Sequence, residues 1–166
     1  ISTIHSGTAA GVFTRLLDMG VEPYLLASSV TGVLAQRLVR VICAECKTPQ
    51  TPSPEDLLRF GLSRGAQLHM GTGCAACRNT GYAGRTAIGE ALSMNEDLAE
   101  ALLRHPRTRA LHEIALRMGM KPLLSQGVAK ARAGVTTLNE LRRVLPVEFS
   151  SNVTRQSGAD EESVEP

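Results

Sequence analysis

Two cysteine pairs, Cys43-Ala-Glu-Cys46 and Cys74-Ala-Ala-Cys77, are the most informative pattern in this 166-residue chain. They use all four of its cysteines. Two residues between the members of a pair let both thiolates turn toward one centre, and two pairs complete the tetrahedral sulfur shell that Zn²⁺ prefers. The stretch between the pairs, residues 47–73, is long for such a pattern, but loop-closure entropy grows only logarithmically with length. The spacing therefore predicts a structural metal, zinc before iron.

Two other uses of these cysteines stay open on sequence alone, namely two disulfides or four free thiols in a core. Disulfides persist in oxidising compartments, whereas the first residues have no secretory-signal pattern and the cysteine usage suits a reducing cytosol. His69 lies five residues before Cys74 and could replace a cysteine as ligand, but four thiolates already close the shell. We expect a closed site in which the metal cross-links the chain and has no open coordination position for a substrate.

The composition allows one domain of ordinary size or two small units, because 43% of the residues are hydrophobic and can form a core. Aromatic residues make up only 3%, with no Trp, which leaves few platforms for stacking nucleic-acid bases. Residues 147–166 hold five acidic side chains and one basic one, so residues 1–146 carry a net charge of +6. No apolar run approaches the length of a membrane span, so we expect any membrane role to go through partner proteins.

The first forty residues predict two helices. Apolar side chains recur at helical spacing after Thr8, and Gly20 suits the position that ends such a helix. Pro23 fits the first turn of a second helix, whose apolar face would continue to Val41 and deliver Cys43 to its metal. The residues of this second face are Leu26, Val30, Val33, Leu34, Leu38 and Val41.

Between and after the cysteine pairs the pattern is mixed. Residues 47–54 contain three prolines and are expected to form a loop. Ser53 before Pro54 predicts the start of a short helix that Gly61 ends. Residues 82–94 alternate in polarity after glycines, which favours a strand or hairpin.

From Asn95 onward the chain predicts a small bundle of helices. Asn95 can cap the first, and a stripe at residues 111, 114, 115 and 118 marks the next. A third is expected from about Pro122 to Gly134, and residues 137–140 have capping-box spacing ahead of a last helix that Pro146 ends. Residues 147–166 are polar, acidic and aperiodic, so we expect a disordered tail.

Several runs together resemble the C-terminal part of the type II secretion traffic ATPases, which are close relatives of the type IV pilus assembly ATPases. The runs are Ser2-Thr-Ile-His5, Thr14-Arg-Leu-Leu-Asp-Met-Gly-Val-Glu-Pro23, Leu25-Leu-Ala-Ser-Ser29, Val33-Leu-Ala-Gln-Arg-Leu-Val-Arg40, Gly81-Tyr-Ala-Gly-Arg-Thr-Ala-Ile-Gly-Glu90 and Gly134-Val-Thr-Thr-Leu-Asn-Glu-Leu141. They occur in the family's order over residues 1–145, with the tetracysteine insertion between the ATPase core and the terminal helices.

The resemblance implies an α/β fold that is the end of a RecA-like P-loop ATPase domain, with a small tetracysteine zinc insertion and a C-terminal α-helical bundle. It implies the following division: residues 1–42 end the RecA-like domain, 43–80 form the zinc insertion, 81–94 return to the core, 95–146 form the helical subdomain, and 147–166 are the tail. The similarity also implies that the chain is a C-terminal fragment of a longer subunit.

The function implied is that of a hexameric cytoplasmic ATPase, peripheral to the inner membrane, which powers protein secretion through platform proteins in that membrane. A pilus assembly ATPase is the alternative from the same family. The 166 residues contain no G-x-x-x-x-G-K-[ST] phosphate loop and no acidic Walker B run, both of which phosphoryl transfer in this class requires. We therefore expect no hydrolysis by this chain alone, with ATP and Mg²⁺ used only by the full-length subunit.

The resemblance also assigns candidate residues outside the cysteines. His5 matches the histidine of the family's His box, which approaches the nucleotide phosphates, although Ser6-Gly7 replaces the usual Thr-Asn. Guanidinium groups suit contacts between subunits, which makes Arg37, Arg40 and Arg85 candidates for such contacts, although solvated surfaces explain them equally. Arg15, Arg37 and Arg40 could contact either a phosphate or a neighbouring subunit, since a bidentate guanidinium suits both, but solvated helix faces are the commoner explanation.

Two alternatives come from other classes of protein. The run from Cys74 to Gly81 resembles a zinc repeat of the forty-kilodalton heat-shock chaperones, which would make the chain a polypeptide-binding module. Asn79 replaces one glycine of that repeat, and the first cysteine pair lacks its glycines altogether. A zinc ribbon that binds nucleic acid is the third candidate, and the few aromatic residues and the modest body charge disfavour it.

Overall fold

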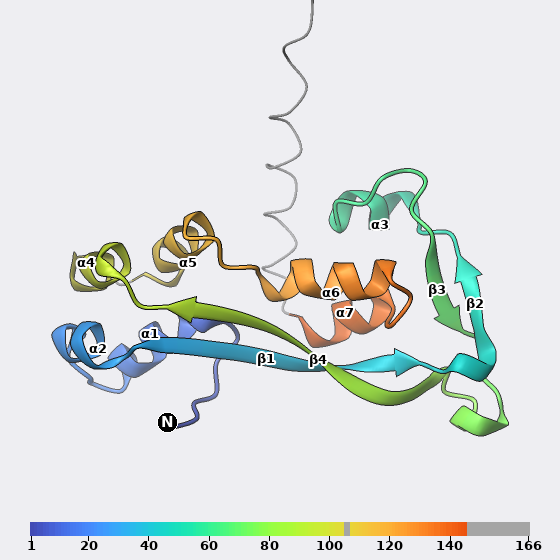
Figure 1. Cartoon of the computed structure of the whole chain (residues 1–166), viewed down its shortest axis with the longest axis horizontal. Helices are drawn as coiled ribbons and strands as arrows, with labels where there is room; N and C mark the ends of the chain where they lie inside the picture. The colour runs from blue at the N-terminus through green and yellow to red at the C-terminus, as the bar shows by residue number, and fades with distance from the viewer. Residues whose placement is uncertain (105–106, 146–166) are drawn as a thin grey trace, which may run out of the picture. The chain divides into compact units, whose positions relative to one another are not determined.

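The chain, seen in a computed structural model that describes residues 1–104 and 107–145, has a mixed α/β fold made of two compact units. The first unit consists of residues 1–37 and 87–126, and the second holds residues 38–86 and those from 127 onward. Two long strands, β1 (Gly32–Ile42) and β4 (Tyr82–Ser93), pair with each other and each begins in one unit and ends in the other (Figure 1). The predicted α/β class is confirmed.

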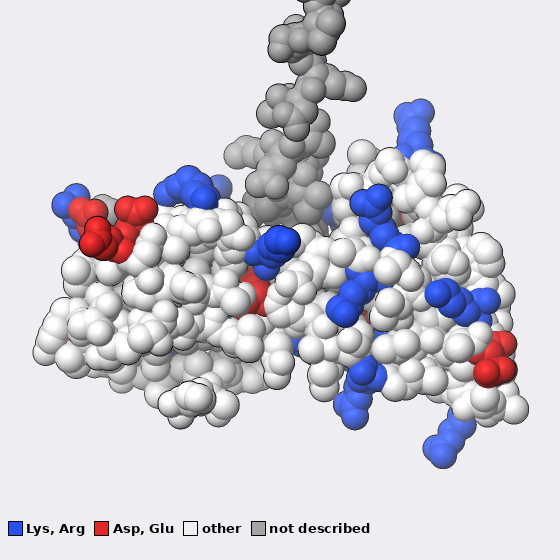
Figure 2. Space-filling model, viewed as in Figure 1, with Lys and Arg blue, Asp and Glu red and all other residues white. Residues whose placement is uncertain are grey.

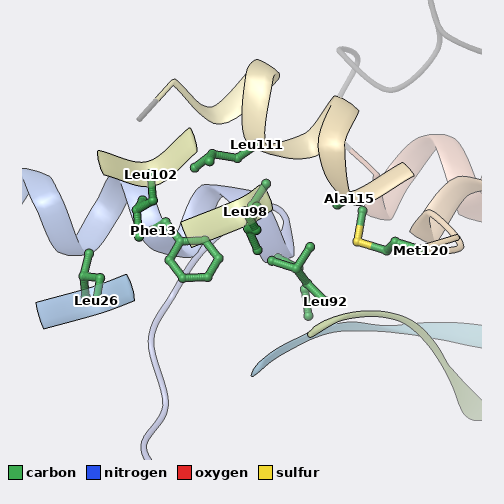
Figure 3. Packing of buried hydrophobic residues seen from close by; sticks show 11 residues of the cluster. Phe13, Leu26, Leu92, Leu98, Leu102, Leu111, Ala115 and Met120 are labelled. Carbon is green, nitrogen blue, oxygen red and sulfur yellow. The ribbon is translucent and has the colours of Figure 1, made fainter. Parts of the chain in front are cut away.

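The first unit is a cluster of helices around an apolar core. Its helices are α1 (Ala9–Asp18), α2 (Pro23–Ser29), α4 (Glu96–Arg104), α5 (Thr108–Arg117) and the first residues of α6 (Leu123–Arg132). Figure 3 shows Phe13 among leucines from neighbouring helices, and Phe13, Leu98 and Leu111 are all at most 1% exposed. Burial of such side chains is worth about 1.5–3 kcal/mol each, so this core stabilises the unit.

A buried carboxylate lies inside the same unit. Glu90 on β4 is 1% exposed, and its two oxygens accept hydrogen bonds from the backbone amides of Ala9 at 2.7 Å and Leu123 at 3.1 Å. These two residues begin α1 and α6, where backbone amides lack partners within the helix and the helix dipole favours negative charge. Glu90 therefore ties the starts of two helices to the sheet.

The second unit contains a small hairpin-like sheet, two single-turn 3-10 helices and the last helices. Strand β2 (Lys47–Gln50) runs antiparallel to β3 (Leu68–Gly71), and α3 (Pro54–Arg59) lies between them in the chain (Figure 1). The 3-10 helices η1 (Ala44–Cys46) and η2 (Ala75–Cys77) carry the cysteine pairs, and α7 (Leu138–Val144) ends the described chain. This unit holds every predicted metal ligand.

The helix predicted from Pro23 to Val41 is wrong beyond Ser29. Helix α2 stops there, and the following residues form the strand β1. The apolar residues in this stretch satisfy a spacing of four and an alternation of two at once, so periodicity alone could not decide between them. Ala35 and Val39 are buried on one face, whereas Leu34 and Leu38 are 70% and 51% exposed, which is the alternation of a strand. The β-branched residues of this stretch and pairing with β4 favour the extended form.

The loop predicted at residues 47–54 is wrong in its first half. Residues 47–50 form β2, and Pro49 sits opposite His69 in the pairing with β3. This sheet has two strands, so both are edge strands, and an edge strand accepts proline because one side needs no ladder hydrogen bond. The rest of the stretch agrees with the prediction, since the Ser53 hydroxyl caps α3 by accepting from the amide of Asp56 at 3.1 Å.

The remaining predicted elements form close to where the pattern put them. Thr8 caps α1, residues 82–93 form one strand, and the Asn95 side chain accepts from the amide of Leu98 at 2.9 Å at the start of α4. A single C-terminal bundle is not confirmed, because α4 and α5 belong to the first unit and α7 to the second. Residues 147–166, predicted to be a disordered tail, lie outside the described residues, as does Pro146.

Candidate metal centre

Each cysteine pair lies in a short turn that directly follows extended backbone. Cys43 comes directly after β1 with extended dihedrals, and η1 then turns the chain so that Cys46 points back toward it. Cys74 is likewise extended before η2, which ends at Cys77. A single 3-10 turn separates its first and last residues by three positions, which places both side chains of a pair on one side.

The sulfur atoms of the four cysteines lie within 4.8 Å of one another. The Sγ atoms of Cys43 and Cys74 are 3.9 Å apart, those of Cys46 and Cys77 are 3.9 Å apart, and those of Cys74 and Cys77 are 3.7 Å apart. Tetrahedral zinc with Zn–S bonds of about 2.3 Å puts neighbouring sulfurs about 3.8 Å apart. A disulfide would hold two of them at about 2.05 Å, and all four cysteines are free of disulfides. The donor set therefore fits a tetrathiolate metal site.

Backbone amides point at two of the sulfurs. The amides of Cys74 and Gly81 each donate to Cys77 Sγ at 3.2 Å, and the amide of Gly73 donates to Cys46 Sγ at 3.3 Å. Burial raises the pKa of Cys77, but the amides of Cys74 and Gly81 outweigh it and lower this pKa to about 6. Burial raises the pKa of Cys46 to about 11. The cluster thus favours the thiolate form, which binds metal, at Cys77 even without the charge of an ion.

Two glycines let the backbone segments that frame the centre approach closely. A Cβ atom added to Gly71 would overlap the carbonyl oxygen of Gly81, and one added to Gly81 would overlap that of Gly71. The same Gly81 carbonyl accepts from the amide of Cys43 at 3.0 Å. The sequence alone does not indicate this role for Gly71, since its only signal is a glycine three residues before Cys74.

A buried charge network lies in the same unit, on the strand that leads to Cys43. Glu140 is 0% exposed, and its oxygens accept from Arg40 at 2.7 and 2.8 Å and from Arg143 at 2.7 and 2.9 Å. Burial opposes ionisation, but these guanidinium groups lower the pKa of Glu140 to about 2. Arg40 also lies 4.0 Å over the ring of Tyr82, whose hydroxyl contacts Thr137 at 2.7 Å. The network connects β1 and β4 to α7 within the unit.

The other predicted residues lie apart from the cysteines. Arg40 pairs with Glu140 inside the chain, and the Arg85 side chain is exposed and makes no hydrogen bond or ion pair among the described residues. His69 is not a member of the sulfur cluster. His5 belongs to the first unit, where it lines an open cleft of about 630 Å³ together with residues of α1, among them Arg15 and Asp18. Arg37 donates to the carbonyl oxygen of Ser6 at 2.8 Å.

The chain thus has a mixed α/β fold with a tetracysteine site that fits a metal ion. The cysteines of this site lie in the turns that follow β1 and precede β4. A family model described as "Type II/IV secretion system protein" matches residues 1–143. The chain belongs to this family, as its resemblance to the secretion traffic ATPases predicted.

Three relatives named for secretion or pilus assembly support the same assignment. The chain is 45% identical over 145 residues to the type IV pilus assembly ATPase PilB of Thermus thermophilus, covering 85% of this chain and 16% of that protein. It is 42% identical over 144 residues to the type II secretion system protein E of Pectobacterium carotovorum and 40% identical over 146 residues to the type II secretion system ATPase E of Vibrio cholerae. Each of these two matches covers 87% of this chain and 29% of the relative. The chain thus spans less than a third of the length of these relatives.

In residues 1–104 and 107–145, no helix is both long and apolar enough to span a bilayer.

Proposed function

We propose that this chain works within an ATPase that powers protein secretion through the type II system. The observation that carries the proposal is the family match over residues 1–143, supported by 40–42% identity to proteins named for that system. Assembly of type IV pili is the second candidate, because PilB is 45% identical over a similar stretch. In either case the chain contributes the end of a RecA-like domain, the tetracysteine insertion and the helices that follow.

The four cysteines would hold one structural Zn²⁺. Bound there, zinc supplies cross-linking of two turns and no reaction chemistry, because four protein thiolates leave no open coordination position. Cys43 and Cys46 would bind it from the end of β1, and Cys74 and Cys77 from η2. The amides of Cys74 and Gly81 stabilise thiolate charge at this centre. We infer that the insertion is a rigid support for the strands it joins.

Nucleotide chemistry would involve His5 in the first unit. His5 is exposed on the cleft, where Arg15 supplies a cation and Thr14 supplies a hydroxyl. These groups suit contact with a phosphate, but the 166 residues hold no phosphate loop, so ATP and Mg²⁺ would be held mainly by other parts of the ATPase. The chain alone should therefore show no ATP turnover above background, and turnover by pure chain that His5→Ala abolishes would contradict this.

We propose assembly into a hexameric ring in the cytoplasm, where the motor acts on platform proteins of the inner membrane. The described residues of the second unit hold ten basic and four acidic side chains, against seven of each in the first. Figure 2 shows many of these Lys and Arg side chains at the surface. Arg85 is exposed and is a candidate to meet carboxylates of a neighbouring subunit. This basic surface favours acidic protein partners.

Complementation tests the proposal and separates its two versions. The complete ATPase subunit carrying this chain is expressed in one bacterial strain that lacks its type II secretion ATPase and in another that lacks its pilus assembly ATPase. We expect rescue of secretion, and loss of that rescue with Cys74→Ser and His5→Ala at equal protein levels. Rescue of piliation alone would favour the second candidate. Rescue of neither, by a stable protein whose partners match those of the host, would contradict the proposal.

A further inference from the structure

Three hydrogen bonds hold the segment that follows His5. The Ser6 hydroxyl donates to the carbonyl oxygen of Thr8 at 3.0 Å, and the Thr8 hydroxyl accepts from the amide of Gly11 at 2.9 Å. The carbonyl oxygen of Ser6 accepts from Arg37 Nη2 at 2.8 Å. The first two contacts are local to the start of α1, whereas the third comes from β1, 31 residues away in the chain.

Arg37 is well suited to this contact. Its side chain is half-buried, and its second terminal nitrogen, Nη1, donates to the carbonyl oxygen of Gln36 at 3.1 Å. Two donors on one planar group are thereby bonded, which fixes the orientation of the guanidinium. Among the described residues the Arg37 side chain makes no ion pair with an acidic residue, and its hydrogen bonds there go to these two carbonyl groups.

The side chains of this segment pack closely against the start of α1, which leaves little space for a second conformation of the segment. A Cβ atom added to Gly11 would lie 2.8 Å from the Ser6 hydroxyl and 2.9 Å from the Thr8 hydroxyl, so both side chains already fill the space beside α1. Ser6 is the residue after His5, and both line the cleft with Thr14 and Arg15 of α1. A bond that fixes the Ser6 carbonyl therefore limits where the His5 ring can point.

We propose that Arg37 is a positioning residue that holds the His5 segment against the cleft, instead of a contact between subunits. The proposal rests on the role of His5 in nucleotide binding given above. Arg37 is expected not to touch the nucleotide itself. Removing its guanidinium should leave the fold intact, because the local hydrogen bonds around Thr8 and the core of the unit remain.

The first test uses the 166-residue chain with isotope-labelled histidine. Replacement Arg37→Gln should broaden the His5 ring signals and shift them toward those of an unstructured peptide, because the Ser6 carbonyl loses its hydrogen bond to β1. Arg37→Lys keeps one donor and should reverse part of this shift. Arg85→Gln, which removes an exposed arginine without polar contacts, serves as the matched control and should match the wild type. Unchanged His5 signals in Arg37→Gln would overturn the proposal.

The second test separates this proposal from the proposed function. ATP turnover by the complete subunit is measured for His5→Ala, Arg37→Gln and the double variant. We expect both single variants to lower kcat by more than they change KM, and the double variant to be no worse than His5→Ala. If His5→Ala lowers turnover and Arg37→Gln does not, Arg37 does not position His5 for the reaction. If Arg37→Gln loosens the His5 segment but neither variant changes turnover, Arg37 positions the segment and the nucleotide role of His5 is wrong.

Discussion

At the scale of single residues, Glu140 is a buried acidic side chain that two arginines pair with. It is fully buried, yet Arg40 and Arg143 neutralise it and lower its pKa to about 2 from 4.5. A carboxyl group with a lowered pKa adds stability that is complete above its unfolded-state pKa and is lost as the pH falls through its folded-state pKa. The contribution of Glu140 is therefore present at neutral pH and disappears between about pH 4.5 and pH 2.

The replacement Glu140→Gln should lower the free energy of unfolding by about 3 kcal/mol at pH 7, because folding lowers the pKa of this carboxyl from 4.5 to about 2. This difference between variant and wild type should shrink as the pH falls from 4.5 toward 2. Urea unfolding at about pH 7, 4.5 and 3 measures it. Glu22→Gln is the control, because the Glu22 side chain is exposed and makes no hydrogen bond or ion pair with the described residues. A difference that stays constant over this range would show that ionisation of Glu140 is not its source.

The close contact between Gly71 and Gly81 leads to a second prediction, which concerns metal retention. A methyl group there would overlap the Gly81 carbonyl and push apart the two segments that frame the cysteines. Gly71→Ala should therefore weaken metal retention by tenfold or more, measured by competition with a zinc chelator, at about 1.4 kcal/mol per tenfold. Gly65→Ala is the matched control, because nothing lies within 4 Å of the position of its added Cβ. Equal retention in the two variants would mean that the close approach of these glycines does not support the site.

At the scale of elements, the first unit depends on one strand residue to fix two helix starts. Glu90 accepts from the first amides of α1 and α6. The amides of a helix start have no partners within the helix, so removing this carboxylate leaves two buried donors unsatisfied.

Glu90→Ala should lower the free energy of unfolding by about 3–6 kcal/mol, since each of its two hydrogen bonds to a charged group contributes about 1.5–3 kcal/mol. Denaturant unfolding measures the change. Glu100→Ala provides the comparison, because its ion pair with Arg104 is exposed and worth at most about 1 kcal/mol. A loss no larger than that of Glu100→Ala would rule out a structural role for the buried carboxylate.

Helix starts were the elements most easily predicted from the sequence. Thr8, Ser53, Asn95 and Thr137 each accept from a backbone amide at the expected position, because a cap is a local interaction between residues two or three apart. Strand β1 could not be predicted in the same way. Its apolar spacing suits either a helix or a strand, and its strand form depends on β4, a partner about fifty residues further on.

At the scale of the whole molecule, the candidate metal site was predictable and its surroundings were not. The spacing within each cysteine pair is set by ligand geometry, so the sequence alone led to Cys43, Cys46, Cys74 and Cys77 as one cluster. The contacts that support it join distant segments: Gly71 meets Gly81 only after β3 forms, and Arg40 meets Glu140 across 100 residues of chain. Local patterns hold no signal for such pairs. Contact between Arg37 and Ser6 escaped prediction for the same reason.

We propose that one structural zinc ion cross-links the tetracysteine insertion of this type II/IV secretion system family member. Elemental analysis of the 166-residue chain, purified under reducing conditions without chelator, measures it most directly. We predict one zinc per chain, and a loss of that zinc in Cys74→Ser, because three thiolates no longer close the tetrahedral shell. Metal content near zero in correctly folded wild-type chain would contradict the claim.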